Sequence, residues 1–134
     1  MNKKILFTGA VFGLLGIVFG AFGAHGLKAL ISVDAIQSFE TGVRYQMYHA
    51  ILLLIVGYST YLESKIKNGV FYLVLFGIIL FSGYIYSLAT NDLTSFDFKR
   101  IAFITPLGGL LLILSWVVLL IGIVRHKINE NKKA

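Results

Sequence analysis

The sequence predicts an all-α fold: an integral membrane four-helix bundle formed by a single transmembrane domain over residues 1–134. Three observations support this prediction, namely the composition, the spacing of the charged residues and a regular series of glycines. Of the 134 residues, 57% are hydrophobic and 13% are charged, whereas ordinary soluble domains carry roughly 25% charged residues. A soluble chain this short cannot bury so much apolar surface, so we expect it to fold in lipid.

Charged residues divide the chain into four long uncharged segments. A helix needs about 20 apolar residues to cross a hydrocarbon layer roughly 30 Å thick, and each segment is close to that length. We therefore predict spans near 5–25, 44–62, 69–89 and 101–124. The first span could instead be a cleaved signal peptide, but the apolar part of such a peptide usually has about 7–15 residues. We therefore favour a span that stays in the membrane.

Lysine and arginine flank the spans unevenly, which predicts an orientation. An even number of spans puts both ends of the chain on one side, and that side carries eight such residues against four on the other. Because cytoplasmic loops are enriched in these residues, we expect both termini and the 63–68 loop to be cytoplasmic. The net charge of +6 then reflects membrane-flanking positions and contact with anionic lipid, and we expect no nucleic acid partner. The chain has no cysteine, which excludes disulfides.

Glycines recur along one face of the first span with spacings of 4, 3, 4 and 3. We call this set the glycine seam: Gly9, Gly13, Gly16, Gly20 and Gly23. In lipid, helices associate through close van der Waals contact, and small residues let the backbones approach. We expect the seam to pack against another helix, either of this chain or of a second copy. Further packing positions are predicted in the later spans at Gly83, Gly108 and Gly109.

The second span is predicted to be longer than the membrane is thick. Ser32 is a typical N-cap residue, and a helix over 33–62 would be about 45 Å long. Its first ten or so residues should then form an extracytoplasmic interfacial helical arm that follows the first helix and bends at Gly42. Ile36 and Phe39 lie on one apolar stripe of this arm.

Polar side chains within the spans are costly in lipid and need a partner or a purpose. The candidates for a ligand site or polar network are His25, Arg44, Tyr45, Gln46, His49 and Thr105. Gln46 and His49 lie three residues apart, so they share a helix face. An interhelical hydrogen-bond network is the favoured interpretation. A ligand or headgroup site with Arg44 on a phosphate, and a metal or haem site with His25 and His49, are alternatives.

Two histidines without a third ligand are weak support for a metal, so we expect neither a metal nor another cofactor. No carboxylate lies inside a span, and no metalloprotease or nucleophile-elbow motif occurs. We therefore assign no catalytic residue, and the balance leans away from an enzyme. The same lack of a carboxylate counts against a proton-coupled pump.

Four stretches resemble the YgdD/YwdK-type family of small bacterial membrane proteins, the domain of unknown function four-two-three. They are GAFGAHGL at 20–27, FETGVRYQ at 39–46 with Tyr48-His49-Ala50, FSG at 81–83 with Tyr86, and TPLGG at 105–109 with Trp116. The resemblance covers nearly the whole chain, in order. It implies a helical protein of the bacterial cytoplasmic (plasma) membrane and implies no reaction.

Our leading functional hypothesis is a non-enzymatic interaction or accessory protein that forms a homo-oligomer through its glycine-rich faces. The alternative is a lipid or small-molecule binding protein, or an enzyme, with a polar site in the outer half of the bundle. An oligomeric pore is a further alternative. The lipid bilayer is the partner that all three share.

Overall fold

The computed structural model describes residues 1–131, apart from the side chains of residues 127–130. All its regular elements are helical, which confirms the predicted fold class. The long helices are α1 (Lys3–Ala24), α2 (Val33–Tyr58), α3 (Ser64–Ile78) and α5 (Ile104–Asn131). The π-helical turn η2 (Ile79–Gly83) and α4 (Tyr84–Ala89) continue α3 as one rod. Short 3₁₀ turns complete the chain: η1 (Leu27–Ala29), η3 (Asn91–Leu93) and η4 (Phe98–Ile101).

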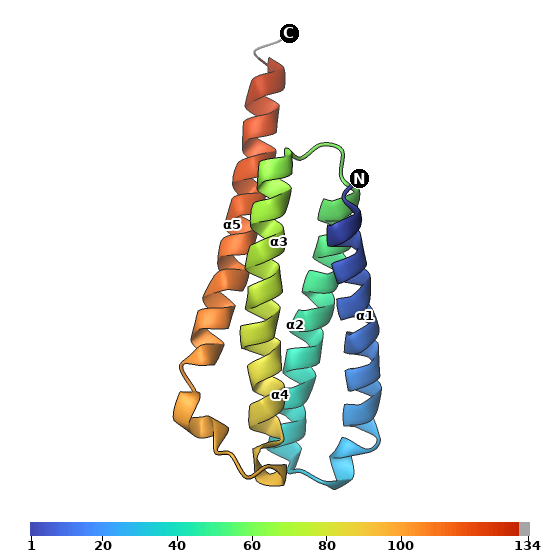
Figure 1. Ribbon diagram of the computed structural model, residues 1–134, viewed down its shortest axis with the longest axis vertical. Coiled ribbons are helices and arrows are strands. Elements are labelled where there is room, and N and C mark those ends of the chain that lie inside the picture. The colour runs from blue at the N-terminus through green and yellow to red at the C-terminus, as the bar shows by residue number, and fades with distance from the viewer. Residues whose placement is uncertain (132–134) are drawn as a thin grey trace.

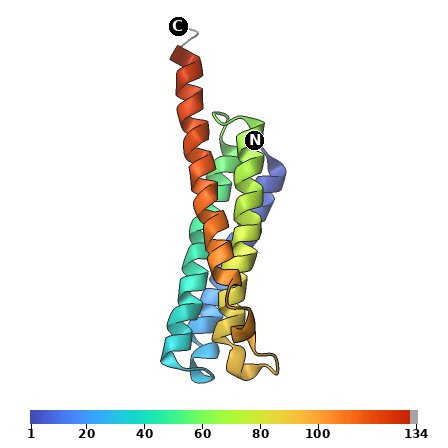
Figure 2. The same cartoon turned by 90° about the vertical axis from the view of Figure 1, so that its left-hand side faces the viewer.

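Four helical rods lie side by side with their axes roughly aligned, as Figures 1 and 2 show. The main packing partner of α1 is α2, and α5 packs mainly against α3 and η2. The start of α1 and the end of α5 lie at the same end of the bundle as the α2–α3 connection (Figure 1). The α1–α2 and α4–α5 connections lie at the opposite end, which we call the loop end.

Specific caps position α1 and α2. The Asn2 side chain accepts a hydrogen bond from the Ile5 N–H, and the Asn2 N–H donates to the Gly57 carbonyl at 2.8 Å. The first contact caps α1, and the second ties its start to the end of α2. Ser32 Oγ accepts from the Ala35 N–H at 3.2 Å, which confirms the predicted N-cap of α2.

The bend predicted at Gly42 is wrong, because α2 runs unbroken through that residue (Figure 1). The apolar stripe of its first turns packs inside the bundle. Ile36 and Phe39 are buried in a cluster with Leu27 and Ala89. These contacts hold the first turns of α2 between the end of α1 and the end of α4. The helix also ends at Tyr58, short of the predicted 62.

The glycine seam packs along α2 of the same chain. A methyl group added at Gly9 would lie 3.0 Å from the Ala50 carbonyl oxygen, and one at Gly23 would lie 3.0 Å from the Phe39 ring. The three glycines between them also face α2. The sequence left open which helix covers the seam, and the fold assigns that role to α2. Close backbone approach along the whole length of α1 follows from this small-residue face.

The start of α5 makes the closest backbone contact given by any glycine among the described residues. A methyl group at Gly108 would lie 2.4 Å from the Phe81 backbone nitrogen within η2. Gly109 faces the Phe81 ring at 3.6 Å, and Gly83 has open space to 4.0 Å. Of the three further predicted packing glycines, Gly108 is therefore the one on which helix contact depends. The sequence did not predict η2, a type of turn that is rare in proteins.

Three helical segments of the described chain are long and apolar enough to cross a membrane: 3–29, 64–89 and 104–126. The helix α2 falls outside this group because its middle carries Arg44, Gln46 and His49. It nevertheless packs lengthwise against α1 and against the rod formed by α3, η2 and α4 (Figure 1). Its buried polar side chains therefore need hydrogen-bond partners within the bundle.

Candidate functional site

Gln46 joins three helices from the middle of α2. Its side chain is 3% exposed. The amide Nε2 donates to the Phe12 carbonyl of α1 at 2.9 Å, and Oε1 accepts from the Tyr86 hydroxyl of α4 at 2.7 Å. Gly16 lies 3.7 Å from Nε2, measured from the position of an added methyl group. A glycine there leaves the Phe12 carbonyl open to a side chain from the neighbouring helix.

His49 joins α2 to α5. Its side chain is 4% exposed, and Trp116 Nε1 donates to its Nε2 at 3.1 Å. An indole N–H can only donate, so this imidazole nitrogen carries a lone pair. The proton then sits on Nδ1, which lies 2.7 Å from the Tyr45 carbonyl and donates to it. His49 is therefore a neutral histidine with both ring nitrogens engaged, which is the arrangement of a structural brace.

His25 lies apart from the other polar candidates. It is exposed at the C-cap of α1. Along the α1/α2 contact, Gly13 faces Ala50 while Gly23 faces Phe39, so His25 and His49 are about 18 Å apart along the helix axis. These two histidines do not meet. Among the described residues, no group of three His, Asp or Glu side chains gathers at a spacing that could hold a metal.

The remaining predicted candidates occupy the rim of the bundle. Arg44 is exposed, and its Nη2 donates to Thr41 Oγ1 at 3.0 Å. The half-exposed Tyr45 ring lies 5.1 Å from the Phe81 ring, centroid to centroid. Thr105, at the start of α5, lines a hollow near the loop end. The predicted cluster is thus divided between two buried braces and several exposed positions.

Two buried contacts were not predicted from the sequence. Ser82, in η2, is fully buried and its Oγ donates to the Gly42 carbonyl at 2.7 Å. Trp116 is the partner of His49. It lies well inside the fourth predicted span, away from the interfaces where tryptophan gathers. A tryptophan N–H at that depth needs an acceptor, and this signal was present in the sequence.

Separate hollows follow one another between α2 and α5, and we call this row of hollows the α2/α5 groove. Its lining residues follow one face of each helix: Thr41, Tyr45 and His49 are spaced by four on α2, as are Thr105, Gly109 and Ile113 on α5. Three successive hollows of roughly 330, 310 and 310 Å³ make up the groove.

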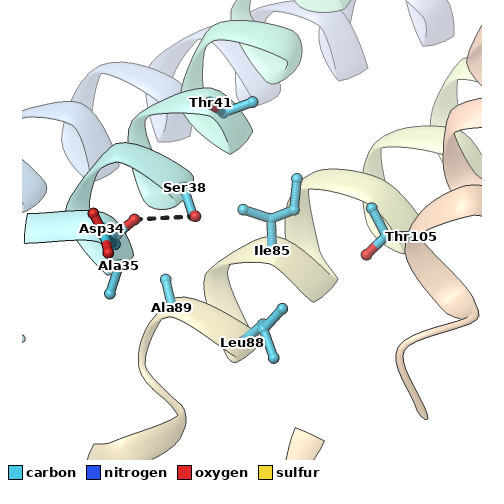
Figure 3. A pocket seen from close by; sticks show the side chains of 8 residues that line it. All are labelled: Asp34, Ala35, Ser38, Thr41, Ile85, Leu88, Ala89 and Thr105. Carbon is cyan, nitrogen blue, oxygen red and sulfur yellow. Dashed lines mark hydrogen bonds between the residues drawn. The ribbon is translucent and has the colours of Figure 1, made fainter. Parts of the chain in front are cut away.

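The first, near the loop end, is the polar hollow, and its lining is drawn in Figure 3: Asp34, Ala35, Ser38, Thr41, Ile85, Leu88, Ala89 and Thr105. The middle hollow is lined by Tyr45, His49, Phe81, Gly109, Leu112, Ile113 and Trp116. The terminal hollow is lined by Ile55, Val56, Ser59, Tyr61, Leu62, Leu119 and Ile123. The hydrogen bond between His49 and Trp116 links the two walls near the centre of the groove. All three hollows are therefore mainly apolar, and the polar hollow is named for having the largest polar share of the three.

Fold and site together define a small helical membrane protein with internally paired polar side chains and a lateral groove. The comparisons with known proteins agree. Residues 19–109 match the family described as Protein of unknown function (DUF423). The chain is 38% identical to a UPF0382 membrane protein of Staphylococcus saprophyticus over 90% of this chain and 96% of that protein.

Two other relatives are equally extensive. The chain is 36% identical to the UPF0382 membrane protein YwdK of Bacillus subtilis, over 92% of this chain and 98% of the relative. It is also 36% identical to a UPF0382 membrane protein of Haemophilus influenzae, over 95% and 98% respectively. The chain belongs to this family of membrane proteins of unknown function, as its motifs indicated. No solved structure matches it.

Proposed function

We propose that this chain is a non-enzymatic protein of the bacterial cytoplasmic membrane that binds a membrane lipid along its α2/α5 groove. The observation that carries the proposal is the groove itself. Each of its hollows measures at least about 310 Å³, within the range of roughly 300–1,000 Å³ typical of ligand sites. An apolar groove on a membrane-embedded bundle faces hydrocarbon, and an acyl chain has the shape and polarity to fill it.

The orientation proposed for the chain is four spans with both termini in the cytoplasm. The eight-to-four asymmetry of lysine and arginine supports it, as does the position of the start of α1 and the end of α5 at one end of the bundle (Figure 1). Near that end, Lys4 Nζ donates to the Tyr72 hydroxyl at 2.8 Å and lies 4.7 Å from the Phe71 ring centroid. A lysine that rests on aromatic rings is typical of a membrane boundary.

The internal use of the buried polar groups supports a non-enzymatic role. Gln46, His49 and Ser82 each satisfy their hydrogen-bonding groups with partners in the chain. Among the described residues, no buried side-chain nitrogen or oxygen lacks a partner. These groups act as braces between helices, which leaves the groove as the feature available to a ligand.

Self-association remains a prediction on which this proposal does not depend. Because α2 covers the glycine seam, a second copy would have to meet a different surface. The outward faces of α1 and α5 carry large apolar residues, including Phe7, Ile17, Ile113 and Leu120. Lipid covers such faces as readily as protein does.

A groove-filling substitution tests lipid binding. Gly109→Leu places its side chain in the middle hollow, since an added methyl group there meets only ordinary contacts at 3.6 Å. Gly83→Leu is the matched control, because Gly83 also has space and lies in a different hollow. Native mass spectrometry after release from lipid nanodiscs would count the lipids retained by each protein. We expect Gly109→Leu to lose most retained lipid while Gly83→Leu retains it; equal retention by the two variants would contradict the proposal.

A further inference from the structure

We infer that the polar hollow recognises the headgroup of an aminophospholipid, with a primary ammonium group at Asp34 and Ser38 and the phosphate at Arg44. This inference rests on the proposed lipid groove and specifies the class of lipid that the groove binds. The hollow lies between the first turns of α2, the end of α4 and the start of α5 (Figure 3). In the proposed orientation this is the outer membrane interface, where headgroups lie.

The hydroxyl groups of the hollow present acceptors to a ligand. Ser38 Oγ donates its proton to the Asp34 carbonyl at 3.1 Å, and Thr41 Oγ1 donates to the Gln37 carbonyl at 3.0 Å. Figure 3 shows the first of these bonds along the wall of the hollow. A hydroxyl has one proton, so each of these two hydroxyls has only lone pairs left for a further partner. Both side chains therefore favour a ligand that donates hydrogen bonds.

The charge near the hollow also favours a ligand with N–H donors, in particular a cation. Asp34 is one of its lining residues, and its exposed carboxylate has no hydrogen-bond or ion-pair partner within the described part of the chain. A carboxylate beside acceptor hydroxyls attracts a cation and repels a free phosphate. A primary ammonium group supplies a positive charge and three N–H donors. It satisfies Asp34 and Ser38 together.

Arg44 places a cation one turn beyond the acceptors. Its Nη2 donates to Thr41 Oγ1 at 3.0 Å, so the guanidinium lies next to a residue that lines the hollow. A guanidinium has five N–H donors in a planar fork that fits phosphate oxygens. The order along α2 is therefore acid, hydroxyl, hydroxyl, guanidinium. A headgroup with an ammonium at one end and a phosphodiester at the other matches that order.

The apolar residues of the hollow lie between the proposed headgroup position and the part of the groove that would hold the acyl chains. Ile85, Leu88 and Ala89 of α4 line its floor. Beyond Thr41 the groove continues into the middle hollow, where Ile113 and Trp116 line the wall. A lipid bound by its headgroup at the loop end would thus lay an acyl chain along α5.

Three lipids with identical acyl chains separate the chemical contributions. Phosphatidylethanolamine has a phosphate and a primary ammonium, phosphatidylcholine has a quaternary ammonium without N–H donors, and phosphatidylglycerol has no ammonium. Competition between them in mixed nanodiscs, read by native mass spectrometry, ranks the headgroups on the unmodified protein. We expect phosphatidylethanolamine to be retained about fivefold over each of the others, the ratio that corresponds to about 1 kcal/mol for an exposed ion pair.

Variants at Asp34 and Arg44, each with a matched control, test which residues set the headgroup preference. Asp34→Asn should abolish the preference for phosphatidylethanolamine, whereas Asp92→Asn, an exposed carboxylate in η3, should leave it intact. Arg44→Gln should lower retention of all three phospholipids about equally, with the exposed Arg100→Gln as its control. Thermal unfolding of each variant shows whether the fold is retained.

The outcomes separate this inference from the proposed function. Equal retention of the three lipids, or a preference for phosphatidylglycerol, would overturn the headgroup assignment and leave the groove as a lipid site. A preference that survives Asp34→Asn would overturn the assignment as well. No retention of any lipid, together with no difference between Gly109→Leu and Gly83→Leu, would overturn both. The ranking on the unmodified protein requires no variant, so it holds even where a variant fails to fold.

Discussion

The helix α2 has two different neighbours, and the contrast between them separates scaffold from site. Toward α1 it meets a row of glycines, and the two backbones approach until an added methyl group at Gly9 would lie 3.0 Å from a carbonyl oxygen. Toward α5 it meets larger residues across the α2/α5 groove, with the His49–Trp116 hydrogen bond between the walls. The helix α2 therefore has a closed contact with α1, where glycines let the backbones approach, and hollows toward α5, where the two helices make few contacts.

Substituting one glycine on each side of α2 should produce the largest difference. At Gly9, isoleucine would push against the Ala50 carbonyl and the Leu53 Cβ, which lies 3.1 Å from an added methyl group. Overpacking of this kind costs about 1–3 kcal/mol or more of unfolding free energy. At Gly109 the same substitution projects into the groove and should cost less than about 0.5 kcal/mol. Denaturation in mixed micelles measures both, and equal losses would remove the distinction between closed contact and groove.

Removing the brace on the α1 side should have the next largest effect. Gln46→Leu keeps the volume but leaves the Phe12 carbonyl and the partly buried Tyr86 hydroxyl without their present partner. An unsatisfied buried polar group costs about 1–3 kcal/mol. Tyr86→Phe removes the orphaned hydroxyl, so the double variant should be less destabilised than the sum of the two single variants. Strict additivity in this double-mutant cycle would show that the two side chains are not coupled.

Removing the brace on the α5 side should have the smallest effect. Trp116→Phe keeps an aromatic ring and deletes the N–H that donates to His49. Interhelical hydrogen bonds in membranes contribute about 0.6 kcal/mol on average, so we expect a loss near that value. Because α5 keeps its contacts with α3 and η2, the fold should survive. A loss larger than that of Gln46→Leu would mean that α5 depends on the groove bond more than the packing indicates.

Several features of the fold were predictable because they depend on local pattern. The four uncharged segments and the start of α2 at Ser32 follow from residue type and spacing, and each is present as helix. The glycine spacing predicted a packing face, and that face is packed. The interhelical hydrogen bonds expected for Gln46 and His49 are present, but the two side chains do not meet a common group, because Gln46 bonds to α1 and α4 and His49 bonds to α5. All these signals are complete within a single helix.

Other features were not predictable because lipid removes the signal that would reveal them. In water, an amphipathic pattern distinguishes the inward face of a helix from the outward one. In a membrane, the outward face is as apolar as the packed one, so Ile36 and Phe39 read equally well as an interfacial stripe or a buried contact. The π-helical turn η2 has no simple pattern either. It brings Ser82 to the Gly42 carbonyl and Phe81 to Gly108, contacts that exist only once the helices are together.

The sequence by itself determined that this is a helical membrane protein of a recognisable family, with one glycine face and a few buried polar groups. Only the tertiary structure decided that α2 covers that face, that His25 stands apart from His49, and that Trp116 is the histidine's partner. The physical reason is that composition and spacing fix what each helix presents, whereas partner identity depends on which surfaces meet. The α2/α5 groove arises from that meeting, since its walls come from residues as distant in sequence as Thr41 and Thr105.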